Sequence, residues 1–169
     1  MCTLAVAWQV DRRWPLVVAA NRDERLGRAA EPWGLRQPPL APRYAAPLDR
    51  VGGGTWIGVS ARGVFAALTN HHVAGRGFPD PRRRSRGELV VRALARGSAA
   101  EARAALSGDD AARWNPFHLF VADAAQAFLW LYDGAERALV DLGPGLHVVT
   151  ERDAEGRGPR GDLLRARWP

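Results

Sequence analysis

Apolar residues in the first part of the chain form short, nearly unbroken runs. The runs at 4–10 and 16–20 are separated by a polar segment that contains a proline, which predicts a β-hairpin with its turn at 11–15. Because neither run alternates with polar residues, we expect both faces of this hairpin to be covered. A second hairpin is predicted over 55–60 and 64–69, where aromatic and β-branched residues are frequent.

The segment between the two hairpins, residues 28–50, is rich in proline. Proline has no amide hydrogen, and it therefore weakens helix interiors and central strands. We expect a long ordered loop over this segment, one that either carries function or packs over the core.

Helix signals appear only in the middle of the chain. Ser85 with Glu88 and Ser98 with Glu101 fit the Ser-x-x-Glu capping box, in which two side chains bond free amides of the first turn. Four further strands are predicted over 117–121, 127–132, 138–142 and 146–150, and the tail at 151–169 has the composition of an incomplete helix. The order of strands, helices and strands indicates an α+β layered domain rather than a doubly wound one.

The composition excludes several classes of chemistry. All 24 basic residues are arginines, so Schiff-base formation, pyridoxal phosphate attachment and a phosphate-loop lysine are excluded. Cys2 is the only cysteine, which excludes an internal disulfide and a thiolate zinc cluster. His71 and His72 are neighbours whose side chains point to opposite faces of a strand, so they cannot share a metal ion. We expect a single domain over 1–169 with neither metal nor cofactor.

The charge pattern bears on partners. The net charge of +6 and the isoelectric point near 11.0 raise the question of nucleic acid. The densest arginine stretch, Arg76 to Arg86, lies among glycines and prolines, which favours a solvated loop over a nucleic-acid patch. No apolar run is long enough to span a bilayer, and no basic region precedes residues 4–10 as in a signal peptide. We therefore expect a cytoplasmic protein.

Cys2 directly follows Met1, which aminopeptidases remove when the second residue is small. Removal would leave a thiol and an α-amine on one residue. An α-amine titrates near about 7.7–8.0, so at neutral pH part of it is uncharged and can accept the proton of the thiol. From Cys2 alone, however, an incidental cysteine at a chain end is the simpler interpretation.

Polar residues at two strand ends change that balance. Asn21, Arg22, Asp23 and Glu24 follow the second predicted strand, and hairpin pairing returns Asp23 to the level of residue 2, where its carboxylate can hold an amine. Asn70 ends a later strand, where its amide can donate to an oxyanion. The alternative for the first group is an ordinary charged turn.

Several ordered motifs together resemble one family. They are the opening Met-Cys-Thr, the Asn-Arg-Asp-Glu segment at 21–24, Gly-Gly-Thr-Trp-Ile-Gly at 53–58, Ala-Leu-Thr-Asn at 67–70 and Ser-Arg-Gly-Glu-Leu at 85–89. The chain resembles, over most of residues 1–150, the family named after its Asn-Arg-Asp-Glu motif, also called the transport and Golgi organisation protein 2 family. That family is similar to the cysteine N-terminal nucleophile hydrolases, such as bile salt hydrolases and penicillin V acylase.

The resemblance implies a four-layer αββα sandwich, and a reaction at linear amide bonds other than peptides. It assigns Cys2 as the nucleophile, Asp23 as the acidic residue at its amino group and Asn70 as the oxyanion-hole residue. Asn21, Arg22 and Glu24 would contribute to binding. Because members of the family are longer than 169 residues, we expect the final part of the sandwich to be missing, which leaves room for a homodimer in which a second copy covers that face.

Two positions depart from the hydrolases. Their arginine before the Asn-x-Asp segment corresponds to Ala20, and we expect Arg22, two positions later, to point to the opposite face of the strand. A functional asparagine after a later strand is replaced by Glu151.

Two functions follow from the resemblance. The first is an amidohydrolase or acyltransferase that forms a thioester at Cys2. The alternative is a non-catalytic carrier of an amphipathic small molecule, such as a lipid, acyl-coenzyme A or haem, since eukaryotic members of the family have been linked to those ligands.

Overall fold

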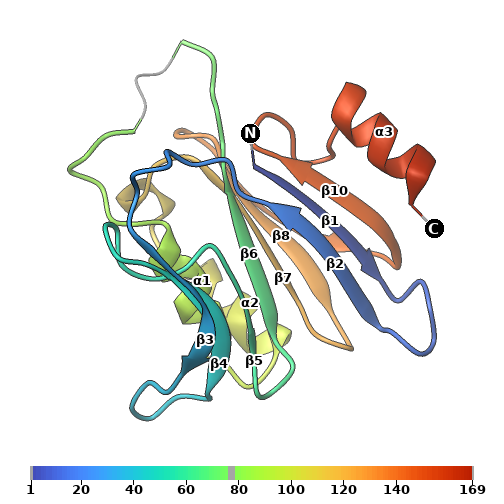
Figure 1. Ribbon diagram of the computed structural model, residues 1–169, viewed down its shortest axis with the longest axis horizontal. Coiled ribbons are helices and arrows are strands. Elements are labelled where there is room, and N and C mark those ends of the chain that lie inside the picture. Colours follow the sequence, from blue (N-terminus) through green and yellow to red (C-terminus); the bar gives the residue numbers. More distant parts are fainter. Residues whose placement is uncertain (1, 76–78, 169) are drawn as a thin grey trace.

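Four layers of secondary structure make up the protein in the computed structural model, which describes residues 2–75 and 79–168. Helices α1 (Gly87–Leu94) and α2 (Ala99–Ser107) pack on one face of a seven-stranded sheet, and a three-stranded sheet lies on its other face. Helix α3 (Pro159–Arg167) packs against the three-stranded sheet (Figure 1). The order helix, sheet, sheet, helix confirms the expected αββα arrangement.

The three-stranded sheet contains the first predicted hairpin. Its order is β10-β1-β2, with β1 (Thr3–Trp8) antiparallel to both β2 (Leu16–Asn21) and β10 (Gly145–Thr150). The central strand β1 is buried along its whole length, whereas β2 is at the edge and is largely exposed on one face. The expectation that both faces are covered is therefore right for β1 and wrong for β2, one face of which lacks a covering layer because α3 packs mainly on β10.

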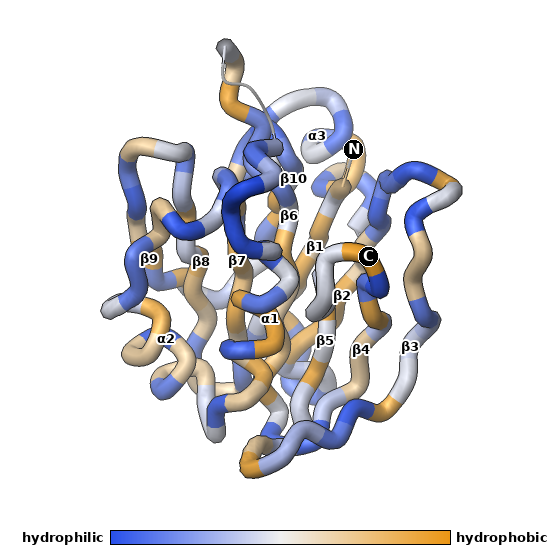
Figure 2. The backbone as a smooth tube through the Cα atoms, turned by 90° about the vertical axis from the view of Figure 1, so that its left-hand side faces the viewer, coloured by the Kyte–Doolittle hydropathy of each residue, from blue (hydrophilic) through white to orange (hydrophobic). Residues whose placement is uncertain are grey.

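The seven-stranded sheet is antiparallel throughout, in the order β3-β4-β5-β6-β7-β8-β9. The second hairpin and the later strands are confirmed. They are β5 (Ile57–Ser60), β6 (Phe65–Asn70), β7 (Phe117–Ala122), β8 (Ala127–Tyr132) and β9 (Arg137–Leu142). Figure 2 shows apolar residues along the paired strands and hydrophilic residues in the connections.

The loop predicted over residues 28–50 is wrong, because this segment forms β3 (Ala30–Arg36) and β4 (Tyr44–Asp49) at the edge of the sheet. Pro32 falls where the β3 and β4 register shifts, and β4 pairs with β5 only before Pro47. Both prolines thus occupy positions where the ladder does not need their amide hydrogens.

Of the two predicted capping boxes, one is confirmed in part. Ser98 caps α2 by accepting a hydrogen bond from the Glu101 amide at 3.1 Å, but the Glu101 carboxylate accepts the amide of Gly97, at 2.9 Å, and not that of Ser98. The box at Ser85 is wrong. Helix α1 begins at Gly87, and the Ser85 hydroxyl instead donates to the Gly53 carbonyl at 3.2 Å, which ties the start of α1 to the glycine-rich turn.

Gly54 lies within that turn with a φ of +77°, and a Cβ there would stand 2.6 Å from the carbonyl carbon of Gly87. Only glycine permits both this backbone conformation and this approach.

The remaining helical segments are short. A single 3-10 turn, Ala111–Arg113, precedes β7, and α3 confirms the helical tail. Within residues 2–75 and 79–168, no helix is both long and apolar enough to cross a membrane.

Candidate functional site

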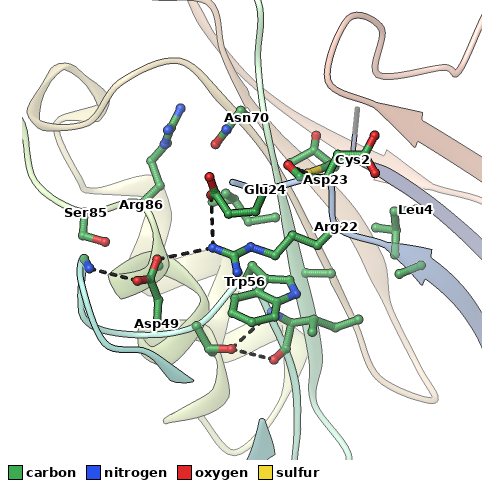
Figure 3. Close-up of a pocket in the computed structure, with 18 of the residues that line it drawn as sticks. Cys2, Leu4, Arg22, Asp23, Glu24, Asp49, Trp56, Asn70, Ser85 and Arg86 are labelled. Atoms are coloured by element: carbon green, nitrogen blue, oxygen red, sulfur yellow. Dashed lines mark hydrogen bonds and ion pairs between the residues drawn. The ribbon is translucent and has the colours of Figure 1, made fainter. Parts of the chain in front are cut away.

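A cavity of about 1120 Å³ lies where β1, β2 and β6 meet the turn after β4 and the start of α1 (Figure 3). The structure brings all six predicted site residues to its lining: Cys2, Asn21, Arg22, Asp23, Glu24 and Asn70. They come from the two sheets, so the cavity is built by the packing of one sheet against the other.

Cys2 immediately precedes β1 and is half-buried in this lining. Its Sγ is 3.9 Å from the backbone carbonyl oxygen of Asp23, and its amide nitrogen donates to Oε2 of Glu151 at 3.3 Å. Burial raises the pKa of the Cys2 thiol, and the negative charge of Glu151 raises it further. The thiol is therefore protonated at neutral pH, and it needs a base before it can attack.

Glu151 is the residue that sequence reasoning noted only as a departure from the hydrolases. It follows the end of β10, the strand that pairs with β1, which explains how a residue so far along the chain reaches Cys2. The His72 amide donates to the Glu151 carbonyl at 2.7 Å, so the end of β6 fixes its backbone. The only signal in the sequence was its position after a predicted strand.

The side chains of Asn21 and Asp23 are joined, with Asn21 Nδ2 donating to Asp23 Oδ1 at 2.9 Å. Both line the cavity, and Figure 3 shows Asp23 beside Cys2. The contact of Asp23 with Cys2 is made by its backbone carbonyl oxygen, and its carboxylate is held by Asn21.

The expectation that Arg22 points to the opposite face from Ala20 is wrong. Strand β2 ends at Asn21, and Arg22, just beyond it, lines the same cavity as Ala20. Its guanidinium carbon lies 3.8 Å from the centre of the Trp56 ring. Its Nη2 is 3.2 Å from Oε2 of Glu24 and 3.6 Å from Oδ2 of Asp49. The cation is thus held by a ring and two carboxylates.

Asp49, which sequence reasoning missed, organises this wall of the cavity. Its Oδ2 accepts a hydrogen bond from Arg28 Nη2 at 2.7 Å, and its Oδ1 accepts the amides of Val51 and Gly52 at 3.0 Å each. Burial favours a higher pKa for Asp49, but the bonds from Arg28 and the two amides outweigh it and the pKa is lowered. An aspartate directly before a glycine-rich turn was the available signal.

Asn70 ends β6 beside two histidines in contact, the buried His118 and the half-buried His71. His118 Nδ1 lies 3.0 Å from the Thr150 carbonyl oxygen, which requires the proton on Nδ1, and its ring centre is 4.2 Å from that of His71. Burial lowers the pKa of His118 to about 4, and His71 contributes in the same direction. The neutral ring therefore ties β7 to the end of β10, next to Glu151.

The arginine-rich segment is only in part the solvated loop that we predicted. Arg76 lies outside the described residues. Arg82 is exposed and pairs with Asp80 at 3.0 Å, whereas Arg83, Arg84 and Arg86 line the cavity.

Comparison with known proteins gives one family. The model of the Transport and Golgi organisation 2 family matches residues 1–165. The Transport and Golgi organization protein 2 homolog of Bos taurus is 35% identical over 146 residues, which cover 80% of this chain and 50% of the bovine protein. The Homo sapiens homolog is 40% identical over 82 residues, or 47% of this chain and 28% of that protein. The chain therefore spans about half the length of its bovine relative.

Among solved structures, the C2A mutant of conjugated bile acid hydrolase from Clostridium perfringens superposes with a TM-score of 0.61. The identity is 12%, and the match covers 87% of this chain and 53% of the hydrolase. At this identity the likeness concerns the fold, which is that of the N-terminal nucleophile hydrolases.

Proposed function

This chain belongs to the Transport and Golgi organisation 2 family, and from that premise we propose that it is an N-terminal nucleophile amidohydrolase or acyltransferase acting through Cys2. The observation that carries the proposal is the position of Cys2. The residue immediately precedes the central strand of one sheet, with its sulfur and nitrogen both held at the cavity by Asp23 and Glu151.

The proposed reaction starts after removal of Met1, which lies outside the described residues. The α-amine of Cys2 takes the proton of the thiol, and the thiolate attacks the carbonyl carbon of a non-peptide amide. The side-chain amide of Asn70 donates to the oxyanion of the tetrahedral intermediate. The C–N bond then breaks, and the leaving amine takes the proton from the α-ammonium.

The second half of the reaction returns the enzyme to its starting state. Water, or an acceptor amine, attacks the thioester carbonyl and gives its proton to the α-amine. The C–S bond breaks, the acyl group leaves as an acid or a new amide, and Cys2 recovers its proton. No group outside the chain and its two substrates is needed.

The surrounding residues have distinct parts in this proposal. Asp23 orients the α-amine, with Asn21 holding the carboxylate at 2.9 Å. Glu151 binds the same nitrogen from the β10 side at 3.3 Å. The guanidinium of Arg22, fixed on Trp56, offsets the negative charge of Glu24 and Asp49 at the cavity wall.

The experiment compares wild type with Cys2→Ala. N-acyl amides of increasing chain length are offered to both, with release of the amine as the measured product. We expect turnover by wild type and none by Cys2→Ala, with unchanged thermal unfolding. Turnover that survives in Cys2→Ala would contradict the proposal. A retained Met1 with no turnover and ordinary thiol reactivity would also reject it, in favour of the carrier of an amphipathic ligand.

A further inference from the structure

Arginines are frequent in the lining of the cavity. Six arginines and four carboxylates line it. Arg22 and Arg28 are paired with Asp49 and Glu24, and Arg84 is paired with Glu88. Arg83 forms no ion pair with any carboxylate in the described part of the chain. The lining therefore carries positive charge that its own carboxylates do not balance.

Arg83 and Arg86 form a rigid pair in that lining. Nη1 of Arg83 donates to the Trp114 carbonyl at 2.8 Å, and Nη1 of Arg86 donates to the Pro116 carbonyl at 3.0 Å. Both side chains thus leave the segment before α1 and reach the same short stretch before β7. A guanidinium has five N–H donors, so the bond to Trp114 orients Arg83 without using its full capacity.

Asn115, between the two carbonyls, makes that stretch rigid. Its Oδ1 accepts the Asp80 amide and its Nδ2 donates to the Asp80 carbonyl, each at 2.9 Å. Burial, and then the charge of Arg28, lower the pKa of Arg86 to about 10. The Arg86 guanidinium is still charged at neutral pH, and because it is poorly hydrated it gains strongly from an anionic partner.

Apolar side chains also line the cavity. Those that belong to the cluster between the two sheets include Leu4, Leu16, Val18, Ile57 and Phe65. Figure 3 shows Leu4 on the Cys2 side and Arg86 on the far side, with Asn70 between Arg86 and Cys2. The lining therefore changes from apolar to cationic, and Cys2 lies between the two parts.

We propose that Arg83 and Arg86 form an anion subsite, which binds a carboxylate or phosphate group on the substrate. The substrate is then an amphipathic amide, with its apolar acyl chain towards Leu4 and its anionic group on the leaving amine. The amide part of this assignment rests on the proposed function, but binding of the anion does not require catalysis.

The test measures binding to the Cys2→Ala protein, so that turnover cannot interfere. The probes are N-decanoylglycine, the phosphate ester of N-decanoylethanolamine, and uncharged N-decanoylethanolamine, titrated by calorimetry. We expect at least one charged probe to bind about tenfold or more tightly than the neutral one. The preferred probe identifies carboxylate or phosphate as the group recognised.

Arg83→Gln and Arg86→Gln, each added to Cys2→Ala, should each remove about tenfold of the affinity for that charged probe and leave the neutral probe unaffected. Arg82→Gln is the matched control. It removes the same charge one residue away, on a side chain that is 88% exposed and paired with Asp80. Arg86→Lys retains the charge and should recover part of the loss if Arg86→Gln folds poorly.

Equal affinity for charged and neutral probes would overturn the anion subsite. An equal loss in Arg82→Gln, Arg83→Gln and Arg86→Gln would do so as well, because it would reduce the effect to overall charge. Charged-probe binding with no turnover by wild type would leave the subsite standing and reject the proposed function instead.

Discussion

Replacing Glu151 by glutamine tests how the site controls the reactivity of Cys2. The substitution keeps the shape of the side chain and removes its charge. In the wild type, Oε2 of Glu151 is 3.3 Å from the Cys2 nitrogen. Burial raises the pKa of the Cys2 thiol, and the carboxylate raises it further because it disfavours a thiolate on the same residue. Glu151→Gln should lower that pKa.

The effect on the thiol is that of a nearby charge, because Glu151 bonds the nitrogen of Cys2 and not its sulfur. Solvent around this half-buried pair weakens the effect but does not change its sign. The pH midpoint of thiol reactivity should therefore fall in Glu151→Gln. Well below the midpoint, Cys2 should then react severalfold faster than in the wild type at a given pH.

The assay is the rate of alkylation by iodoacetamide as a function of pH, followed by intact mass. Glu155→Gln is the control, because Glu155 is on the same turn but its side chain is 73% exposed. We expect its midpoint to stay at the wild-type value. A midpoint that is unchanged or raised in Glu151→Gln would refute the reasoning, since a purely structural role for Glu151 predicts no fall.

Three other substitutions test the surrounding structure. Asp49→Asn should reduce kcat/KM at least about tenfold, because it releases Arg22 and Arg28. Asp109→Asn breaks an ion pair with Arg92 away from the cavity and should affect only thermal unfolding. Equal loss of activity in both variants would contradict this prediction. Gly54→Ala should lower the free energy of unfolding by about 2 kcal/mol more than Gly63→Ala. Both glycines have a positive φ, but only a Cβ at Gly54 would meet backbone, at 2.6 Å. Equal losses in urea unfolding would argue against the close approach of Gly54 to Gly87. The pKa of His118 is about 4 in the folded protein and about 6.5 in the unfolded chain, so His118 contributes stability that is present above pH 6.5 and is lost as the pH falls towards 4. His118→Gln should remove about 3 kcal/mol of this pH dependence of the unfolding free energy. A variant with the wild-type pH dependence would refute this assignment.

Much of the fold could be predicted because local pattern and tertiary environment agree. The hairpin of β1 and β2 followed from two apolar runs and a polar turn, and the cap of α2 followed from Ser98 and Glu101. Residues 28–50 were mispredicted because proline content indicates only what a central strand cannot tolerate. Strand β3 is at the edge, and β4 pairs with β5 only before Pro47. Ser85 was mispredicted because its hydroxyl has a distant partner, the Gly53 carbonyl.

The site divides in the same way. The residues found from the sequence, Cys2, Asp23 and Asn70, belong to motifs, and the structure places them on one cavity. Glu151 was missed as a partner of Cys2 because the register of β10 on β1 brings it there, and Asp49 because its role depends on where Arg22 points. Such long-range contacts are not encoded in local spacing.

The central claim is that Cys2 becomes a free N-terminal nucleophile, and the most direct measurement is the intact mass of the purified protein before and after reaction with p-nitrophenyl decanoate. The account predicts a starting mass without Met1 and the gain of one decanoyl group at Cys2. Hydroxylamine should remove that group, and Cys2→Ala should not acquire it. A protein that retains Met1 and gains no acyl group, or that is acylated equally in Cys2→Ala, would contradict the account.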